Sequence, residues 1–566
     1  MGIAPFMFAA PVLLVGLSVA WLVLSRRRTA RLLSEIRDAW GKGFPGDVDL
    51  AAVSSSASDF SPPVGFYLLD HGTWQDLNLD EVFLRVDHTS SPVGRQHLYA
   101  RLRNPHLAAE PLLDLDRKAN HLMHAPELRE KIQLQLARLR SRGIEHFPAL
   151  LHENQPTLGH LGWLAPALSF LAASLVVLAV FRPGALLALL GVCALNLTVQ
   201  HFARSRMAPI LAAIGSLPVL ISVAKALSRV PDSVLQDETR RLQDGVRSAY
   251  PLARLSRFLG LESANELISS VYTWINMVLL LDVTVFVLLF RRLREHVAEL
   301  RSIHGTLGYL DVLVSVASLR SGLPDHCTPE FLSPRKVLEV EFLRHPLLPS
   351  GVPNDLTLQD EGMALTGSNA SGKTTFIRAL ALNAVLAQSV ATCLAHRYRA
   401  PFLVVRSHIA RQDDLIEQRS YFLTEVEGIG AMLRASDSEQ QHLFIIDEIF
   451  RGTNTVERVA AAKGVLDYLN RGVHMVAVST HDPELLPLLE SPWRLGHFRE
   501  EIVDGLLRFD YRLHPGPTST RNAIRILAAA GFPEEVVISA RSIAARITAF
   551  NPSVSSTSMR LQTGTG

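Results

Sequence analysis

The feature that most restricts the fold of this chain is an eight-residue segment with two glycines, between an apolar segment and a helical one. Residues 363–366 form a short apolar strand candidate. Gly367 to Thr374 reads Gly-Ser-Asn-Ala-Ser-Gly-Lys-Thr, and helical apolar spacing begins at Phe376. This is the pattern G-x-x-x-x-G-K-[ST] in the strand–loop–helix context that it requires. A chance match in a glycine-rich turn is the alternative, and it leaves the flanking strand and helix unexplained. The pattern therefore predicts a phosphate-binding loop in an α/β domain with a mostly parallel sheet.

The chemistry of this loop predicts ATP and Mg²⁺ as its ligands. Glycines let backbone N–H groups wrap the phosphates, and the dipole of the following helix adds to the attraction. Lys373 is expected to reach the β- and γ-phosphates, and Thr374 to ligate Mg²⁺. The predicted nucleotide-binding residues are Gly367, Ser368, Asn369, Ala370, Ser371, Gly372, Lys373, Thr374 and Thr375.

Two further strand candidates end in polar residues of the kind that ATP hydrolysis needs. Residues 442–446 are apolar and lead into Asp447 and Glu448, and residues 475–479 lead into His481. We expect Asp447 to hold Mg²⁺ through water, Glu448 to orient or deprotonate the attacking water, and His481 to sense the γ-phosphate. Each motif alone is also typical of an ordinary solvated strand end. Their position after the phosphate loop favours the catalytic interpretation.

A second constraint is an excess of apolar residues. Hydrophobic residues make up 48% of the chain and charged residues 19%, whereas soluble domains carry about 25% charged residues. Residues 3–24 contain no charge and precede Arg26, Arg27 and Arg28. A helix of this length spans a bilayer, and the arginines are expected on the cytoplasmic side. A cleaved signal peptide is the alternative, but no positive charge precedes the apolar run. We therefore predict a transmembrane anchor over residues 1–28.

Two more apolar regions lie before the phosphate loop. Residues 161–199 consist of two apolar stretches separated by Arg-Pro-Gly at 182–184, a turn signal. We interpret them as a membrane hairpin whose tip crosses to the far side; a buried helical hairpin is the alternative. Residues 271–290 contain Asn276 and Asp282, and an acid at mid-membrane is costly. An extra crossing there would also place the ATP-binding part outside, so we interpret this run as a buried or membrane-surface helix.

The predicted fold class is α plus α/β: an apolar anchor, a helical core and lever domain with a membrane hairpin, and a C-terminal ATPase domain of the phosphate-loop type. The three cysteines form no C-x-x-C pair, so neither a disulfide framework nor a zinc site is expected. The predicted location is a bacterial-type inner (plasma) membrane with the ATPase domain in the cytoplasm. The predicted segments are an anchor at 1–28, a linker at 29–75, the core at 76–335, the ATPase domain at 336–550 and a disordered tail at 551–566.

Several motifs together resemble the ATPase of the MutS mismatch-repair family, which belongs to the ABC-type ATPases. They are the phosphate loop, Arg419-Ser-Tyr-Phe422 with Glu425, and residues 447–455 and 479–482. The likeness extends over roughly residues 75–548, through segments at 87–98, 344–348, 352–355, 509–516, 522–523 and 530–533. It is specific in the ATPase part and weaker in the core.

The resemblance implies a dimer in which two ATPase domains enclose two nucleotides. Ser420 would be the signature residue that completes the γ-phosphate site of the partner subunit, and Asn454 would link the two sites. His481 would act within its own subunit as the switch. Because such a two-fold interface uses the same surface on both subunits, we predict a homodimer through the ATPase domains.

The sequence also departs from the mismatch-repair pattern. An apolar run and a linker stand where a mismatch-reading domain with a Phe-x-Glu wedge is expected, and the apolar hairpin stands where a DNA clamp is inserted. No nuclease-like domain follows residue 550, and the loop reads Ser-Asn-Ala where Pro-Asn-Met is usual. In these respects the chain is most similar to membrane-associated MutS-related proteins of unknown role.

Three functions remain open from the sequence. The first is a membrane-anchored MutS-like ATPase that couples ATP to the binding of mismatched or structured DNA in repair. The second is an ABC-like ATPase that drives a membrane-associated process without DNA, and the third is a scaffold with an inactive ATPase. The net charge of +2 gives no argument for a nucleic-acid partner. DNA could bind at Arg138, Arg140 and Arg142, but a solvated helix face explains these arginines better.

Overall fold

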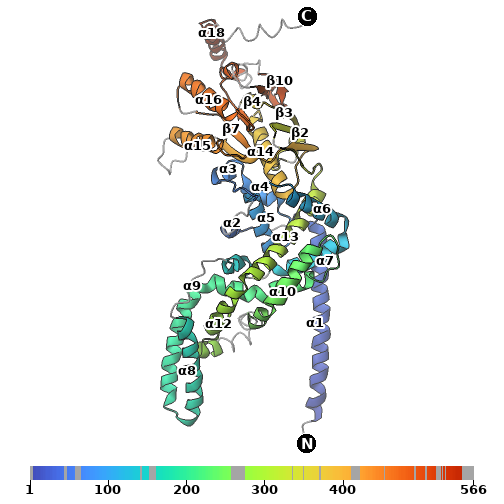
Figure 1. Cartoon of the computed structure of the whole chain (residues 1–566), viewed down its shortest axis with the longest axis vertical. Coiled ribbons are helices and arrows are strands. Elements are labelled where there is room, and N and C mark those ends of the chain that lie inside the picture. The colour runs from blue at the N-terminus through green and yellow to red at the C-terminus, as the bar shows by residue number, and fades with distance from the viewer. Residues whose placement is uncertain are drawn as a thin grey trace. The chain divides into compact units, whose positions relative to one another are not determined.

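The structure is a computed structural model of the whole chain. It forms two compact units, which are described separately (Figure 1). Unit 1 comprises Met1–Ser61, Val86–Arg101 and Arg117–Gly322, and unit 2 comprises Pro62–Arg85, Leu102–Asp116 and Leu323–Gly566. The description covers every residue except 1–3, 44–47, 58–64, 141–142, 152–160, 257–273, 334, 349, 369–370, 410–420, 451–452, 490–491, 504–505, 518–523, 525–526, 529–530 and 551–566.

Unit 1 is helical. Its centre is α13 (Val297–Gly322), which is buried along most of its length because apolar side chains such as Leu307, Leu313 and Val314 cover all of its faces. Helix α10 packs against both α9 and α13. The other helices of this unit are α1 (Ala4–Ala39), α2 (Leu50–Ala57), α5 (Pro92–Arg103), α6 (Glu110–His124), α7 (Pro126–Leu136), α8 (Leu161–Phe181), α9 (Ala185–Leu227), α10 (Gln236–Ser256) and α12 (Leu281–Glu295), with 3₁₀ turns at Ala137–Leu139 and Ile144–Leu150; α5 and α6 extend into unit 2.

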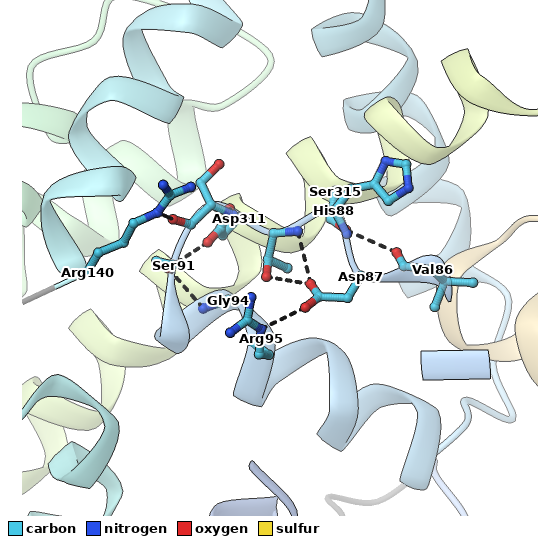
Figure 2. Close-up of polar contacts among 11 residues, drawn as sticks. Val86, Asp87, His88, Ser91, Gly94, Arg95, Arg140, Asp311 and Ser315 are labelled. Carbon is cyan, nitrogen blue, oxygen red and sulfur yellow. Dashed lines mark hydrogen bonds and ion pairs between the residues drawn. The ribbon is translucent and has the colours of Figure 1, made fainter. Parts of the chain in front are cut away.

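A buried carboxylate from α13 caps the start of α5 (Figure 2). Asp311 accepts hydrogen bonds from the backbone N–H of Ser90 (2.8 Å) and the hydroxyl of Ser91 (2.6 Å). Gly94 provides the space for this contact: a β-carbon there would lie 2.2 Å from Asp311 Oδ2. The segment 87–98 therefore docks a helix start against the central helix.

Helices α8 and α9 form the predicted hairpin, with its turn at residues 182–184. The second helix extends beyond the predicted end at 199 to Leu227, because residues such as Ile214, Leu217 and Leu220 are buried and continue the apolar pattern. Among the described residues, two helices are long and apolar enough to span a membrane: Trp163–Phe181, which is 17% buried, and Val297–Gly322, which is 83% buried. The second of these is the core helix α13.

The run at 271–290 packs against this hairpin. The Ser169 hydroxyl donates to Leu279 O (2.6 Å), and the Asn196 side-chain amide donates to Val278 O (2.6 Å). Leu280 has a φ of 47° and separates a short helical segment from α12. Asn276 is buried; residues 271–273 lie outside the described part.

The predicted anchor and linker differ from the structure in extent. Helix α1 continues past the arginine cluster to Ala39, where Ile36 is buried and the Arg37 guanidinium pairs with Glu130 of α7 (2.8 Å). The span predicted as a linker, 29–75, therefore contains the end of α1, all of α2 and the start of α3. Its glycines and serines indicate turns, but apolar side chains between them anchor short helices.

Unit 2 contains a six-stranded sheet in the order β12-β9-β4-β8-β7-β6. All neighbours are parallel except β12, which pairs antiparallel with β9, so the predicted mixed α/β fold with parallel strands is confirmed. Apolar side chains of β7 and β8 pack with those of α15 and α16. The elements of this sheet and its helices are β4 (Gly362–Thr366), β6 (Val404–Ile409), β7 (His442–Asp447), β8 (Met475–Ser479), β9 (Trp493–His497), β12 (His514–Pro515), α14 (Lys373–Val390), α15 (Tyr421–Ala435), α16 (Thr455–Leu469) and α18 (Glu534–Phe550).

Two smaller sheets complete this unit. One has the order β1-β5-β2-β3, and the other is the antiparallel pair β10-β11. Their strands are β1 (Glu330–Phe331), β2 (Val337–Leu343), β3 (Asn354–Gln359), β5 (Arg397–Ala400), β10 (Glu500–Val503) and β11 (Leu506–Phe509).

The predicted boundary at residue 336 does not match the two units. Residues 62–85 and 102–116 belong to unit 2, together with α3 (His71–Asp76) and most of α4 (Leu79–Val86). The reason lies at the sheet edge: the Asp76 carboxylate accepts from Ser407 Oγ (2.9 Å) and Ile409 N (3.0 Å) of β6. Edge strands have unpaired backbone groups that need partners, and a distant segment of the chain provides them.

Candidate nucleotide site

The predicted phosphate loop connects β4 to the N-terminus of α14. Gly367 and Gly372 have φ values of 140° and 111°, a region that favours glycine. A β-carbon on Gly367 would also lie 2.5 Å from Phe498 O. Both glycines are therefore required by the path of the backbone. Asn369 and Ala370 lie outside the described residues, and Thr375 is half-buried in the first turn of α14.

Lys373 points back into the loop. Its buried ammonium group donates to Gly367 O and Ser368 O, both at 2.8 Å. The buried Ser371 hydroxyl also donates to Ser368 O (2.8 Å). The loop is thus folded around the lysine that the sequence predicts to reach the phosphates.

Thr374 and Asp447, the predicted Mg²⁺ ligands, lie side by side. The Thr374 hydroxyl donates to Asp447 Oδ2 at 2.7 Å, and the Ser479 hydroxyl donates to the other carboxylate oxygen. Mg²⁺ is usually held by one or two protein oxygens together with waters and substrate phosphates, and this donor set fits that pattern. In the part of the chain that the structure describes, no group of three or more His, Cys, Asp or Glu residues could hold a metal.

Glu448 and His481 lie within hydrogen-bond distance of each other beside the lysine. Glu448 Oε1 lies 2.8 Å from His481 Nε2, and the same nitrogen lies 3.4 Å from Lys373 Nζ. A carboxylate can only accept, so Nε2 must carry a hydrogen and donate to Glu448. The approach of Lys373 is then a contact between two donors. The structure brings together five of the predicted site residues: Lys373, Thr374, Asp447, Glu448 and His481.

The backbone around Glu448 is unusual. Glu448 and Phe450 have φ values of 57° and 60°, a region that non-glycine residues rarely adopt. The N–H of Glu448 donates to Ser479 O (2.9 Å), and that of Phe450 donates to the Glu425 carboxylate. Glu425 belongs to one of the motifs that resemble the MutS family. In the structure its carboxylate accepts the hydrogen bond from Phe450 N and so helps to hold the turn at 448–450.

Two further contacts at the site have no signal in the sequence. The Ser368 hydroxyl donates to Glu500 Oε2 of β10 (2.7 Å), and Arg458 pairs with Asp482 (2.6 Å). Both join residues that are far apart in the chain, and no spacing pattern marks them. Ser420, the predicted residue for the partner's site, lies outside the described residues.

Three features lie at the ends of the parallel strands: the glycine loop, the Thr374–Asp447 pair and the Glu448–His481 pair. An α/β domain with these features has the arrangement expected of a nucleotide-binding domain. The family model "MutS domain V" matches residues 363–548. The DNA mismatch repair protein MutS of Thermus thermophilus is 31% identical over 265 residues, which cover 46% of this chain and 32% of that protein.

Two further relatives give similar figures. The DNA mismatch repair protein MutS of Lactobacillus delbrueckii subsp. bulgaricus is 33% identical over 277 residues, 46% of this chain and 32% of its own length. The DNA mismatch repair protein MutS 2 of Haloarcula marismortui is 30% identical over 290 residues, 45% of this chain and 30% of its own length. The C-terminal half of the chain is therefore MutS-related, and the chain spans about a third of the length of these curated relatives.

Proposed function

We propose that this protein is a membrane-anchored, MutS-related ATPase that couples ATP binding and hydrolysis to the binding of mismatched or structured DNA. The observation that carries the ATPase part is the hydrogen bond from Thr374 to Asp447 directly behind the Lys373 loop. A phosphate loop followed by a strand-end aspartate is the arrangement that phosphoryl-transfer proteins use to hold nucleotide and Mg²⁺.

The proposed roles use the positions of the described residues and, for Ser420, the resemblance to the MutS ATPases. Backbone N–H groups of the loop and Lys373 would bind the phosphates, and Thr374 and Asp447 would hold Mg²⁺, which would neutralise charge on the phosphate oxygens. Glu448 accepts a proton from the attacking water or orients it. His481 donates toward the γ-phosphate once Glu448 turns to the water. Ser420 completes the site of the partner subunit in a homodimer.

The DNA part of the proposal rests on the relatives, whose names describe DNA mismatch repair. Of the arginines considered from the sequence, Arg138 donates to Gln135 and Ser222, and Arg140 donates to Ser90 O; Arg142 lies outside the described residues.

The membrane part rests on the exposed apolar surface of the α8–α9 hairpin. Phe170, Val180, Phe181 and Leu187 are each between 76% and 78% exposed, and contiguous apolar surface of this kind marks an interaction site. We propose that the hairpin and the predicted anchor at residues 1–28 lie in a bacterial-type inner membrane, with the ATPase domain in the cytoplasm. The same surface supports the second candidate, an ABC-like ATPase that drives a membrane-associated process without DNA.

A gel-shift experiment separates the two candidates. The full chain in detergent is mixed with homoduplex, mismatched and branched DNA, with and without ATP, at a series of salt concentrations. Preference for mismatched or branched DNA that changes with ATP supports the first candidate. No binding to any of the three, by protein that still hydrolyses ATP, supports the second. Lys373→Ala serves as the control that removes the ATP dependence.

A further inference from the structure

An ion pair connects two loops near the candidate site. Arg458, in the first turn of α16, donates from Nε to Asp482 Oδ2 (2.8 Å) and from Nη2 to Asp482 Oδ1 (2.6 Å). Asp482 follows β8 directly after His481. Two parallel charge-assisted hydrogen bonds fix both the distance and the orientation of the two side chains.

The same arginine also holds the turn before α16. Its guanidinium donates to Thr453 O and Thr455 Oγ1, both at 3.4 Å. Its backbone N–H donates to Asn454 O at 2.9 Å. Arg458 therefore joins the segment 453–455 to the segment 480–482. Under the proposed function, the first contains the residue that links the two nucleotide sites and the second contains the switch histidine.

Asp482 in turn restrains His481. The N–H of Asp482 donates to Thr480 Oγ1 (3.0 Å) and closes a short turn with His481 in its middle. His481 then lies 2.8 Å from Glu448. A displacement of Asp482 thus changes the position of the imidazole relative to the proposed base.

We propose that Arg458 is a positioning residue that couples the 453–455 turn to His481 through Asp482. This inference rests on the proposed ATPase function and adds a residue to it. The side chains of Arg458 and Asp482 are 21% and 19% exposed, so the pair is largely shielded from solvent. Its two parallel hydrogen bonds restrain the orientation of both side chains.

The kinetic test uses Arg458→Gln and Asp482→Asn in the full chain. We expect kcat for ATP hydrolysis to fall about tenfold in both, with KM for ATP within about twofold, because a positioned group rather than a nucleotide ligand is lost.

The matched control is Lys463→Gln, which removes a salt bridge to Asp467 within the same helix and should leave kcat and KM unchanged. The exchange Arg458→Asp with Asp482→Arg should recover part of kcat. A kcat within twofold of wild type in both single variants, or a raised KM at unchanged kcat, would overturn the proposal.

A second measurement does not depend on hydrolysis. In hydrogen exchange of the full chain, Arg458→Gln should raise the exchange rate in both 453–457 and 480–483, whereas Lys463→Gln should do so in neither. Unchanged exchange in 480–483 would contradict the coupling. If the wild type does not hydrolyse ATP, the proposed function fails while this measurement still decides the coupling. If Arg458→Gln does not fold, Asp482→Asn decides both experiments.

Discussion

Glu448 Oε1 lies 2.8 Å from His481 Nε2, and the glutamate is held there by a backbone with a φ of 57°. Such a conformation costs energy for a non-glycine residue, and it tends to occur where function requires it. The hydrogen bond from Glu448 N to Ser479 O at 2.9 Å helps to hold it. The carboxylate is thereby directed toward the end of β8, next to the phosphate loop.

Glu448→Gln should retain ATP but stop turning it over. The amide has the shape of the carboxylate but cannot accept a proton, so we expect hydrolysis to fall by at least about 100-fold. Radiolabelled ATP retention and size-exclusion chromatography should show bound nucleotide and a closed dimer. Glu439→Gln, at an exposed loop position, is the control and should hydrolyse ATP normally. Unchanged hydrolysis in Glu448→Gln would exclude Glu448 as the base.

Ser420→Ala should lower hydrolysis without abolishing ATP binding, because the serine is predicted to act on the nucleotide of the partner subunit. Mixing provides a sharper measurement. Ser420→Ala and Lys373→Ala should each hydrolyse ATP far more slowly than wild type on their own, yet a mixed dimer has one site with both residues intact. With random pairing in a two-fold dimer, about a quarter of wild-type activity should return.

Two outcomes would contradict the role of Ser420 in the partner's site. One is the loss of ATP binding in Ser420→Ala, and the other is no recovery in the mixture although subunit exchange is demonstrated. Mixing Ser420→Ala with Glu448→Gln should give the same recovery, since these two residues also belong to different subunits at each site.

Gly94→Ala should destabilise unit 1. The new methyl group would lie 2.2 Å from Asp311 Oδ2, in a buried environment, and overpacking of this kind costs about 1–3 kcal/mol. Chemical unfolding followed by circular dichroism should show this loss. Gly215→Ala is the matched control in the same unit, because nothing lies within 4 Å of its β-carbon position. An unchanged free energy of unfolding in Gly94→Ala would show that Asp311 can move away.

Asp311 should make the stability of unit 1 depend on pH. Burial raises the pKa of its carboxyl group to about 6, above the value of about 3.9 in unfolded chains. The folded state therefore binds this proton more tightly than the unfolded state. Protonation of Asp311 adds at most about 3 kcal/mol to the free energy of unfolding. This contribution is complete below pH 4 and is lost as pH rises through about 6. Burial lowers the pKa of His97 to about 4, which has the opposite effect in the same range.

The measurement is the difference in unfolding free energy between wild type and Asp311→Asn at several pH values from 4 to 7. Taking this difference removes the contribution of His97, which both proteins share. We expect the advantage of the wild type to shrink as pH rises. A difference that does not change with pH would contradict a raised pKa for Asp311.

The proximity of Lys373, Thr374, Asp447, Glu448 and His481 was predictable from the sequence, whereas the division of the chain into two units was not. The positions of Lys373, Asp447 and His481 follow from short motifs, because each stands at the end of a local apolar strand. The assignment of residues 62–85 to unit 2 depends on contacts such as Asp76 with β6. Such contacts join distant parts of the chain and leave no periodic pattern.

Helix α9 extends to Leu227, beyond the predicted apolar stretch that ends at 199. The polar residues Gln200, His201, Arg204 and Arg206 end the apolar run in the sequence without ending the helix. The Arg458–Asp482 pair was missed because a long-range ion pair has no sequence signature. Asp311 was missed because a buried acid in an apolar helix gives no sign of what it caps.

The α8–α9 hairpin should cross the membrane and expose its turn on the side opposite the ATPase domain. Its apolar side chains lie outward and its turn contains Arg182, an exposed residue. In intact cells, a membrane-impermeant maleimide should label Arg182→Cys through the outer face. It should not label Glu439→Cys, at an exposed loop position of unit 2, until the cells are opened. The wild type, with its three native cysteines, gives the background.

Because a charged residue inside the bilayer costs about 2.5–3.5 kcal/mol, the arginine at the turn fits a position beyond the hydrocarbon core. Labelling of Arg182→Cys only after the cells are opened would place the hairpin turn on the cytoplasmic side and contradict a crossing.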